Sequence, residues 1–493
     1  MKDSIIISIL GVIQLFISLL YQIFILNIFG TSRVLDIYFA SNTINFIIVA
    51  VSISVMNFAI TPILIKYYKK NEKKKLEELF SSLFNILFMC FFLFGLFQYF
   101  FAPYILQLIL PGFSIADLEI AIQLFRLQAF LSVINILSAL LLAMHYTFNF
   151  LYRTIIFPLI AQVVQLLFVW IFYKQFGVFA LMYGLIISQF ITFVLFTFPF
   201  IKLYKFKIIF NSELKDASRK IFPLIISSSF SRSNILVDRF FASTLSAGSI
   251  TLLQYGEKII QIINEFINKG ISLVSLRKFS LEHDNEKEFQ RLFLKLYKTI
   301  IFIIVPTIFL IIFYLRDALN LVVLSKNLSS SDVDNIYLVS IAFMGIFIGG
   351  SLSSTITNAF FAKGLTKLIA KMNIILQILG IGLKIGLFYL IGFWGLPIAF
   401  SITSITRSFV LLILYTFYIY NYDKKLLFKY FIKLLFISFL AIFVSKYLID
   451  SSIDLWMVRL FLGPLLFFVI FALLALKFEK DISIIIYNKL KFR

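Results

Sequence analysis

Long apolar segments recur along the whole chain and are separated by short polar connections. A helix that crosses a bilayer needs about 20 predominantly apolar residues, because each residue rises about 1.5 Å. Such segments occur at 5–29, 36–65, 80–101, 121–145, 154–173, 178–201, 221–242, 250–275, 296–315, 336–362, 366–390, 395–420, 430–449 and 456–476. The pattern predicts an all-α polytopic membrane protein with about fourteen transmembrane helices.

Basic residues alternate between the connections. With the N-terminus inside, most of them fall in inner segments such as Lys66–Lys75, 202–220, 277–298 and the tail after Lys477. The outer connections hold few: Arg33, Lys174, Arg316, Lys326 and Lys446. Because cytoplasmic loops of membrane proteins are enriched in Lys and Arg, this alternation predicts that both termini are cytoplasmic.

The composition excludes a water-soluble protein. Of the 493 residues, 61% are hydrophobic and only 14% are charged, against about 45–50% and about 25% in soluble domains. The lipid bilayer is therefore an expected partner. The net charge of +21 could indicate a nucleic-acid ligand, but the basic residues lie in short runs between apolar segments, so we expect no nucleic acid to bind.

The sequence lacks the usual marks of an enzyme. Its one cysteine, Cys90, can form neither an internal disulfide nor a zinc site. His145 and His283 lie far apart in the sequence with no nucleophile nearby, and we interpret both as surface or interfacial residues. No phosphate-binding Gly-x-x-x-x-Gly-Lys-Ser/Thr loop occurs. We expect a transporter without catalytic residues, cofactor or bound metal, driven by an ion gradient, the membrane potential or a substrate gradient.

The two halves of the chain resemble each other. Residues 172–196 and 388–415 both contain a span, a tight glycine turn and a second, alanine-containing span, and Ala129 and Ala342 each precede a phenylalanine in comparable spans. Six spans separate the equivalent positions, so the repeat is parallel, a design found in transporters. It predicts an N-lobe at 1–203, a cytoplasmic linker at 204–220, a C-lobe at 221–421, and two additional helices with a cytoplasmic tail at 422–493.

Charged residues lie inside the predicted spans, where they are costly unless they face a wet cavity or a partner. The basic ones are Arg126, Arg232, Arg239, Lys258, Lys269, Lys384, Arg407 and Arg459, and the acidic ones are Asp36, Asp238, Glu257 and Glu265. The excess of positive charge favours an anionic substrate such as a phosphate or diphosphate. Arg239 and Lys258 are the strongest binding candidates, followed by Lys384 and Arg407; Lys269 and Arg459 lie near span ends and can snorkel.

One block of sequence resembles a known family. Asp238-Arg239 with Ala242-Ser243, Gly248-Ser249 and then Tyr255-Gly-Glu257-Lys258 resembles the seventh and eighth spans of the MurJ (MviN) lipid II flippases. Further stretches are similar at Ile28–Gly30 with Asp36–Phe39, at Thr61–Leu64 and at Asn358–Ala362. These flippases belong to the multidrug/oligosaccharidyl-lipid/polysaccharide (MOP) exporter superfamily.

The resemblance implies two six-helix lobes around a cationic cavity, through which an undecaprenyl-diphosphate-linked saccharide reaches the outer leaflet by alternating access. It implies a bacterial inner-membrane protein, and we expect a monomer. Arg239, Lys258, Lys384 and Arg407 would bind the diphosphate, and Asp36, Asp238 and Glu257 would form gating ion pairs. The family also has arginines in its first two spans, where this chain has Tyr21, Asn27, Ile48 and Val49.

Several functions remain open at this point. The chain could carry lipid II, or another lipid-linked oligosaccharide for O-antigen or capsule. A drug/cation antiporter of the same superfamily would need an acidic cavity, which the basic residues of the spans do not favour. A glycan polymerase or ligase would need longer outer loops than this chain has.

Overall fold

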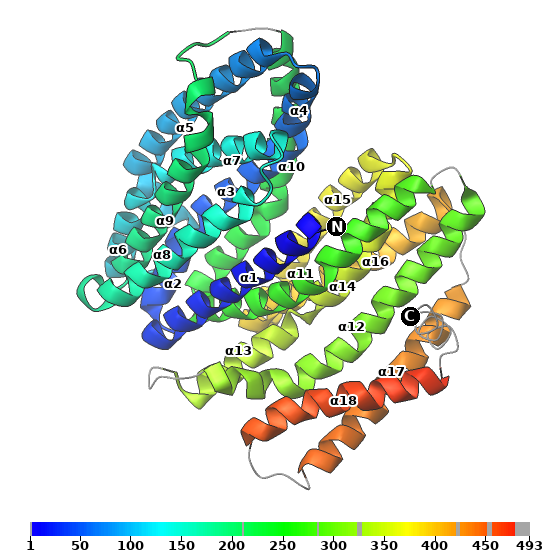
Figure 1. Cartoon of the computed structure of the whole chain (residues 1–493). Coiled ribbons are helices and arrows are strands. Elements are labelled where there is room, and N and C mark those ends of the chain that lie inside the picture. Colours follow the sequence, from blue (N-terminus) through cyan, green and yellow to red (C-terminus); the bar gives the residue numbers. More distant parts are fainter. Residues whose placement is uncertain are drawn as a thin grey trace. The chain divides into compact units, whose positions relative to one another are not determined.

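The computed structural model describes residues 2–209, 212–282, 285–322, 328–420, 424–450 and 456–478 (Figure 1). The regular elements in these ranges are all helices. Those of the first half are α1 (Lys2–Phe29), α2 (Arg33–Ser41), α3 (Thr43–Val55), α4 (Thr61–Lys69), α5 (Lys73–Ile109), α6 (Ile115–Leu127), α7 (Leu131–Thr147), α8 (Arg153–Phe176), α9 (Phe179–Thr197) and α10 (Ser212–Ser243). Those of the second half are α11 (Ser249–Leu281), α12 (Glu286–Val322), α13 (Ser330–Ala342), α14 (Met344–Ala362), α15 (Thr366–Ile391), α16 (Gly395–Tyr418), α17 (Lys424–Asp450) and α18 (Trp456–Phe478).

The chain divides into two compact units, Met1–Thr251 and Leu252–Arg493. Helix α10 belongs to the first unit, where it packs against α3 and α5. The first turn of α11 also lies in this unit, and the rest of α11 lies in the second. The lobe and linker boundaries proposed from the sequence stay predictions.

The polytopic helical fold is confirmed. In the described part of the chain, ten helical segments are long and apolar enough to cross a membrane, or eleven if the pair α6 and α7, bent by 41°, forms one span. The 53-residue segment Thr366–Tyr418 contains two helices, α15 and α16, separated by a short turn. The charged helices α10 and α11, which correspond to the predicted spans 221–242 and 250–275, are not among the ten.

The core of the first unit lies between α3, α4, α5 and α7. Buried apolar side chains such as Met56, Leu64, Phe80 and Leu140 pack there against one another. A π-helical turn, Met56–Ile60, joins α3 to α4, and the following Thr61 donates its hydroxyl to the Met56 carbonyl. The Met56 carbonyl also accepts the Thr61 backbone N–H, so this oxygen is hydrogen-bonded twice inside the bundle, as an apolar environment favours.

The connection after α9 is held along α5. The Lys205 backbone N–H donates to Ser81 Oγ at 3.0 Å, and Asn85 Nδ2 donates to the Lys207 carbonyl at 3.1 Å. The Lys205 ammonium donates to Glu77 at 2.7 Å. This hydrogen bond and the attraction of the carboxylate raise the pKa of Lys205 above its ordinary value, which favours its charged form.

Similar helix N-caps and C-terminal glycines occur in the two units. Ser114 and Ser329 each begin a 13-residue helix, α6 and α13, with a capping box that involves an aspartate three residues later. Helices α8 and α15 both end at a glycine of positive φ, Gly177 at 54° and Gly392 at 60°, a conformation that side chains with a Cβ rarely adopt. The glycine turns occupy equivalent places in the repeat predicted from the sequence.

Small residues allow α14 to approach α16 closely. A Cβ at Gly345 would overlap Ser401, and one at Gly349 would overlap the backbone of Ser404. The Gly345 N–H donates to Ser401 Oγ at 3.0 Å, and that hydroxyl donates to the Ala342 carbonyl. Small residues and short polar side chains are the usual means by which membrane helices associate, because lipid provides no hydrophobic force between them. In the same unit, α17 and α18 pack against each other and against α12.

The α14–α16 contact generates the first prediction. Gly349→Ala should lower the stability of the purified protein by about 1–3 kcal/mol, because the new Cβ has no room against the Ser404 backbone. The matched control is Gly382→Ala in α15, where a Cβ meets nothing within 4 Å and alanine favours the helix by about 1 kcal/mol. Thermal unfolding in detergent, followed by intrinsic fluorescence, measures both. Equal unfolding temperatures for the two variants would contradict the close contact.

Candidate substrate-binding site

Asp36, in α2, is completely buried. Its carboxylate accepts hydrogen bonds from the backbone N–H of Gly248 and from both the N–H and the hydroxyl of Thr251, each at 2.7 Å. The Arg33 guanidinium lies 4.0 Å away. The N–H donors belong to the start of α11, where unpaired backbone groups and the helix dipole favour an anion. In this conformation Asp36 holds the first turn of α11 against α2, and its predicted gating role stays a prediction.

Arg239, in α10, is 5% exposed and has protein partners. Its Nε donates to Thr43 Oγ1 at 3.3 Å and its Nη1 donates to the Ile250 carbonyl at 3.4 Å. Arg239 therefore joins α10 to α3 and to the first turn of α11. Asp238 beside it is 6% exposed. The predicted contact of Arg239 with a diphosphate would require the guanidinium to leave these neutral oxygens or to share its remaining donors.

The other candidates lie in the second unit. Glu257 and Lys258 are adjacent in α11 and partly buried, and Gln261 Nε2 donates to Glu257 Oε1 at 2.6 Å. Lys384, in α15, is 1% exposed, and its ammonium lies 5.1 Å from the centroid of the Phe400 ring of α16, a cation–π arrangement. Arg407 in α16 is partly buried.

Arg407 has a buried donor that no described residue accepts: its Nε has no hydrogen-bond partner within the described ranges. A guanidinium in an apolar bundle keeps such a donor unpaired only at a cost, unless water or an anion reaches it. This is the signature expected of a cation that binds a ligand, and it supports the sequence prediction without testing it.

The remaining cations inside predicted spans differ in their surroundings. Arg126 donates to the Tyr99 carbonyl at 3.2 Å and lies over the Tyr99 ring. Arg232 in α10 is exposed, and Arg459 in α18 is partly exposed. The side chain of Lys269 lies outside the described residues.

The interpretation of His145 as a surface or interfacial residue is wrong. It is completely buried, with Nδ1 2.9 Å from the Leu141 carbonyl. The rings of Phe157, Phe196 and Phe200 surround it. Folding places these distant phenylalanines over the end of α7, which the neighbouring sequence does not reveal. His283 lies outside the described residues, and no cluster of metal-ligating side chains is found within them.

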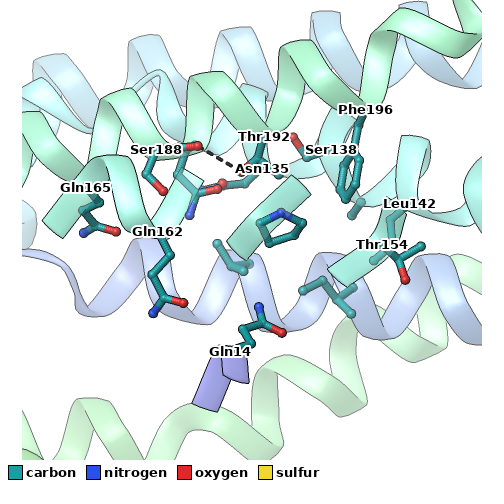
Figure 2. A pocket seen from close by; sticks show the side chains of 15 residues that line it. Gln14, Asn135, Ser138, Leu142, Thr154, Gln162, Gln165, Ser188, Thr192 and Phe196 are labelled. Atoms are coloured by element: carbon teal, nitrogen blue, oxygen red, sulfur yellow. Dashed lines mark hydrogen bonds between the residues drawn. The ribbon is translucent and has the colours of Figure 1, made fainter. Parts of the chain in front are cut away.

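A polar cavity of about 320 Å³ lies within the first unit. Figure 2 shows that its amide and hydroxyl side chains converge from several helices. Helices α1, α3, α7, α8 and α9 all contribute, and the polar lining residues are Gln14, Asn135, Ser138, Thr154, Gln162, Gln165, Ser188, Gln189 and Thr192. None of the lining residues carries a formal charge. The cavity therefore offers hydrogen bonds without an electrostatic preference for either sign.

The sequence prediction did not include this cavity, because it was based on charged residues inside the spans and the cavity lining has none. A signal was nevertheless present: Asn135 and Ser138, Gln162 and Gln165, and Ser188 and Thr192 are spaced three or four residues apart, so each pair shares one helix face.

A second cavity in the first unit is mainly apolar. Its volume is about 430 Å³, and it lies between α3, α5, α7 and α10, with Ile48, Val51, Phe91 and Phe94 in its lining. Ile48 is one of the positions where the family resemblance implies an arginine. Here Ile48 forms part of an apolar wall.

Comparison with known proteins defines the family. The profile of the family described as lipid II flippase MurJ matches residues 25–467. The chain belongs to the MurJ family. A curated MurJ relative, the probable lipid II flippase MurJ of Buchnera aphidicola subsp. Acyrthosiphon pisum (strain APS), is 22% identical over 298 residues, which cover 58% of this chain and 58% of the relative. The aligned part thus spans less than two thirds of that MurJ protein.

The solved structures agree with the MurJ fold. The lipid II flippase MurJ in its inward closed conformation matches with a TM-score of 0.84 and 21% identity, over 97% of this chain and 100% of that one. An inward-facing multidrug resistance MATE family transporter of the MOP superfamily matches with a TM-score of 0.68 and 12% identity, over 82% and 94%. MurJ membership and the many apolar helices make the chain a multi-pass protein of the inner membrane.

The environment of Asp36 generates the second prediction. Asp36→Ala should cost about 2–4 kcal/mol of stability, because three buried donors at the start of α11 lose a charged acceptor. The matched control is Asp332→Ala, which removes an aspartate from the exposed capping box of α13 at a cost of about 1 kcal/mol. Thermal unfolding in detergent compares them, and a larger loss for Asp332→Ala would contradict the assigned role of Asp36.

Proposed function

We propose that the chain is a flippase that moves a polyprenyl-diphosphate-linked saccharide from the inner to the outer leaflet by alternating access. The observation that carries this proposal is the MurJ family match over residues 25–467. The MOP-type fold supports it, because the same architecture serves membrane transporters.

The charge distribution supports an anionic cargo. Lys258, Lys384 and Arg407 lie inside the helices of the second unit, and Arg407 keeps a donor without a described partner. A diphosphate is the part of a lipid-linked saccharide that most needs such cations, since its negative charges would otherwise have to cross hydrocarbon unpaired. Arg239 would join them if its contacts with Thr43 and Ile250 open during transport.

The identity of the saccharide is the finer part of the proposal. Lipid II is the first choice because it gives the matching family its description. The missing arginines keep an O-antigen or capsule precursor as the alternative. In their place, the Tyr21 hydroxyl accepts a hydrogen bond from Gln165 at 2.9 Å and Asn27 donates to the Ile23 carbonyl of its own helix. The Tyr21 contact thus joins α1 to α8, and the Asn27 contact stays within α1.

Orientation, energy source and assembly complete the proposal. Both termini are cytoplasmic, because that orientation places the basic runs on the inner side. An ion gradient or the membrane potential drives transport, and the protein acts as a monomer. Protease protection of tags at either end, in inside-out vesicles, would measure the orientation.

Complementation tests the cargo and is the third prediction. Expression of this chain should restore growth to bacteria depleted of their own lipid II flippase, because both proteins would supply lipid II to the outer leaflet. Growth rate and the accumulation of inner-leaflet lipid II are the measurements. Failure to rescue, together with restored surface polysaccharide in a strain lacking its O-antigen or capsule flippase, would replace lipid II by the alternative cargo.

The fourth prediction concerns Lys258. Lys258→Ala should reduce flipping of a fluorescent lipid II in proteoliposomes by at least about ten-fold, since one charge-assisted contact with phosphate is worth about 1.5–3 kcal/mol. Lys258→Arg should retain flipping. The matched control is Lys278→Ala, which removes an exposed lysine of the same helix and should have little effect. A normal rate for a correctly inserted Lys258→Ala protein would remove Lys258 from the site.

A further inference from the structure

The polar cavity of the first unit contains hydrogen-bonding groups that the described protein residues do not use. Ser138 is 8% exposed, and its buried hydroxyl has no hydrogen-bond partner among the described residues. The amides of Gln14, Gln162 and Gln189 lie partly exposed in the same cavity. Ser138, Gln14 and Gln162 come from α7, α1 and α8 and converge on one space (Figure 2), which Gln189 of α9 also lines.

Other polar groups of the cavity hold its frame. Asn135 Nδ2 donates to Asn45 Oδ1 at 2.8 Å and ties α7 to α3. Gln165 Nε2 donates to the Tyr21 hydroxyl at 2.9 Å and ties α8 to α1. Thr192 donates to the carbonyl of its own helix at Ser188. The lining is therefore divided between groups that fix the helices and groups that remain available for a ligand.

Charge and size decide what kind of ligand fits. No carboxylate lines the cavity, so a metal cation would lie in an apolar bundle without a counter-charge, and no cation lines it, so a phosphate would be equally uncompensated. A volume of about 320 Å³ far exceeds the space of a single ion and falls at the lower end of small-molecule pockets. The lining suits a neutral molecule that both donates and accepts hydrogen bonds.

We propose that this cavity binds the neutral saccharide part of the substrate, and in particular a sugar that carries hydroxyl and acylamino groups. Each glutamine amide offers two N–H donors and one carbonyl acceptor, and the Ser138 hydroxyl offers one donor and an acceptor. A sugar hydroxyl or an acylamino group complements both functions. The inference rests on the proposed flippase function and adds to it a saccharide subsite made by uncharged residues, separate from the cations assigned to the diphosphate.

Two lipid probes distinguish binding of the sugar from binding of the diphosphate. The probes are undecaprenyl diphosphate and the same lipid carrying one N-acetylglucosamine, and binding of each to the purified full-length protein in detergent is measured by native mass spectrometry. Gln162→Leu combined with Gln189→Leu should weaken binding of the sugar-bearing lipid by about ten-fold or more, because two hydrogen bonds are lost at nearly constant volume. Binding of the bare diphosphate lipid should stay within two-fold, roughly the spread of such measurements.

Two further variants exclude a merely structural effect. Ser138→Ala removes a hydroxyl with no described protein partner, so it should weaken binding of the sugar-bearing lipid while leaving the thermal unfolding temperature unchanged or higher. Gln107→Leu replaces an exposed glutamine of α5 that does not line the cavity, and it should change binding of neither lipid.

Each outcome has a distinct meaning. Equal weakening of both lipids, or no weakening of either, overturns the saccharide subsite and leaves the flippase proposal standing if the wild-type protein binds both lipids. A wild-type protein that binds neither lipid overturns the flippase proposal and this inference with it. Selective loss of the sugar-bearing lipid in both the glutamine double variant and Ser138→Ala supports the subsite.

Discussion

Hydrocarbon offers no hydrogen bonds, so every polar group inside the apolar helices must find a partner in the protein, in water or in a ligand. The structure meets this constraint at several places through contacts between helices. Asp36 receives three hydrogen bonds at the start of α11, Arg239 reaches oxygens of two other helices, and Ser401 bonds to the backbone of α14. These contacts position the helices. The groups that remain without a described partner then stand out as the places where function is to be sought.

Two of these remaining groups differ in their chemistry. Arg407 in the second unit is a cation whose buried Nε has no described hydrogen-bond partner. In the first unit, the neutral Ser138 hydroxyl lies in the cavity that the glutamines also line. A lipid-linked saccharide has the same two parts, a charged diphosphate and an uncharged, hydroxyl-rich sugar. The two proposals made above assign the diphosphate to the cations of the second unit and the sugar to the uncharged cavity of the first unit.

The fold is shared with proteins whose sequences differ widely from this one. Identity to the matched MurJ structure is 21%, and to the matched MATE transporter 12%, yet the chains superpose over most of their length. Several elements of this fold are defined by local geometry: glycine turns at Gly177 and Gly392, and glycines where α14 meets α16. The capping boxes before α6 and α13 instead need a serine hydroxyl and an aspartate carboxylate.

The sequence by itself determined the helical, membrane-spanning class, because apolar length and the shortage of charge leave a chain no water-soluble alternative. It also pointed to the family, through the block around Asp238, Arg239 and Lys258. Tertiary structure alone decided the partners of each polar residue. Asp36 and Thr251 are far apart in the chain and meet only after folding. His145 becomes buried because the rings of Phe157, Phe196 and Phe200 lie around it. The cavity exists only where five helices bring their polar faces together. The apolar pattern is a local property of the sequence. The burial and hydrogen-bond pairing of a polar side chain depend instead on contacts between segments that are distant in the sequence.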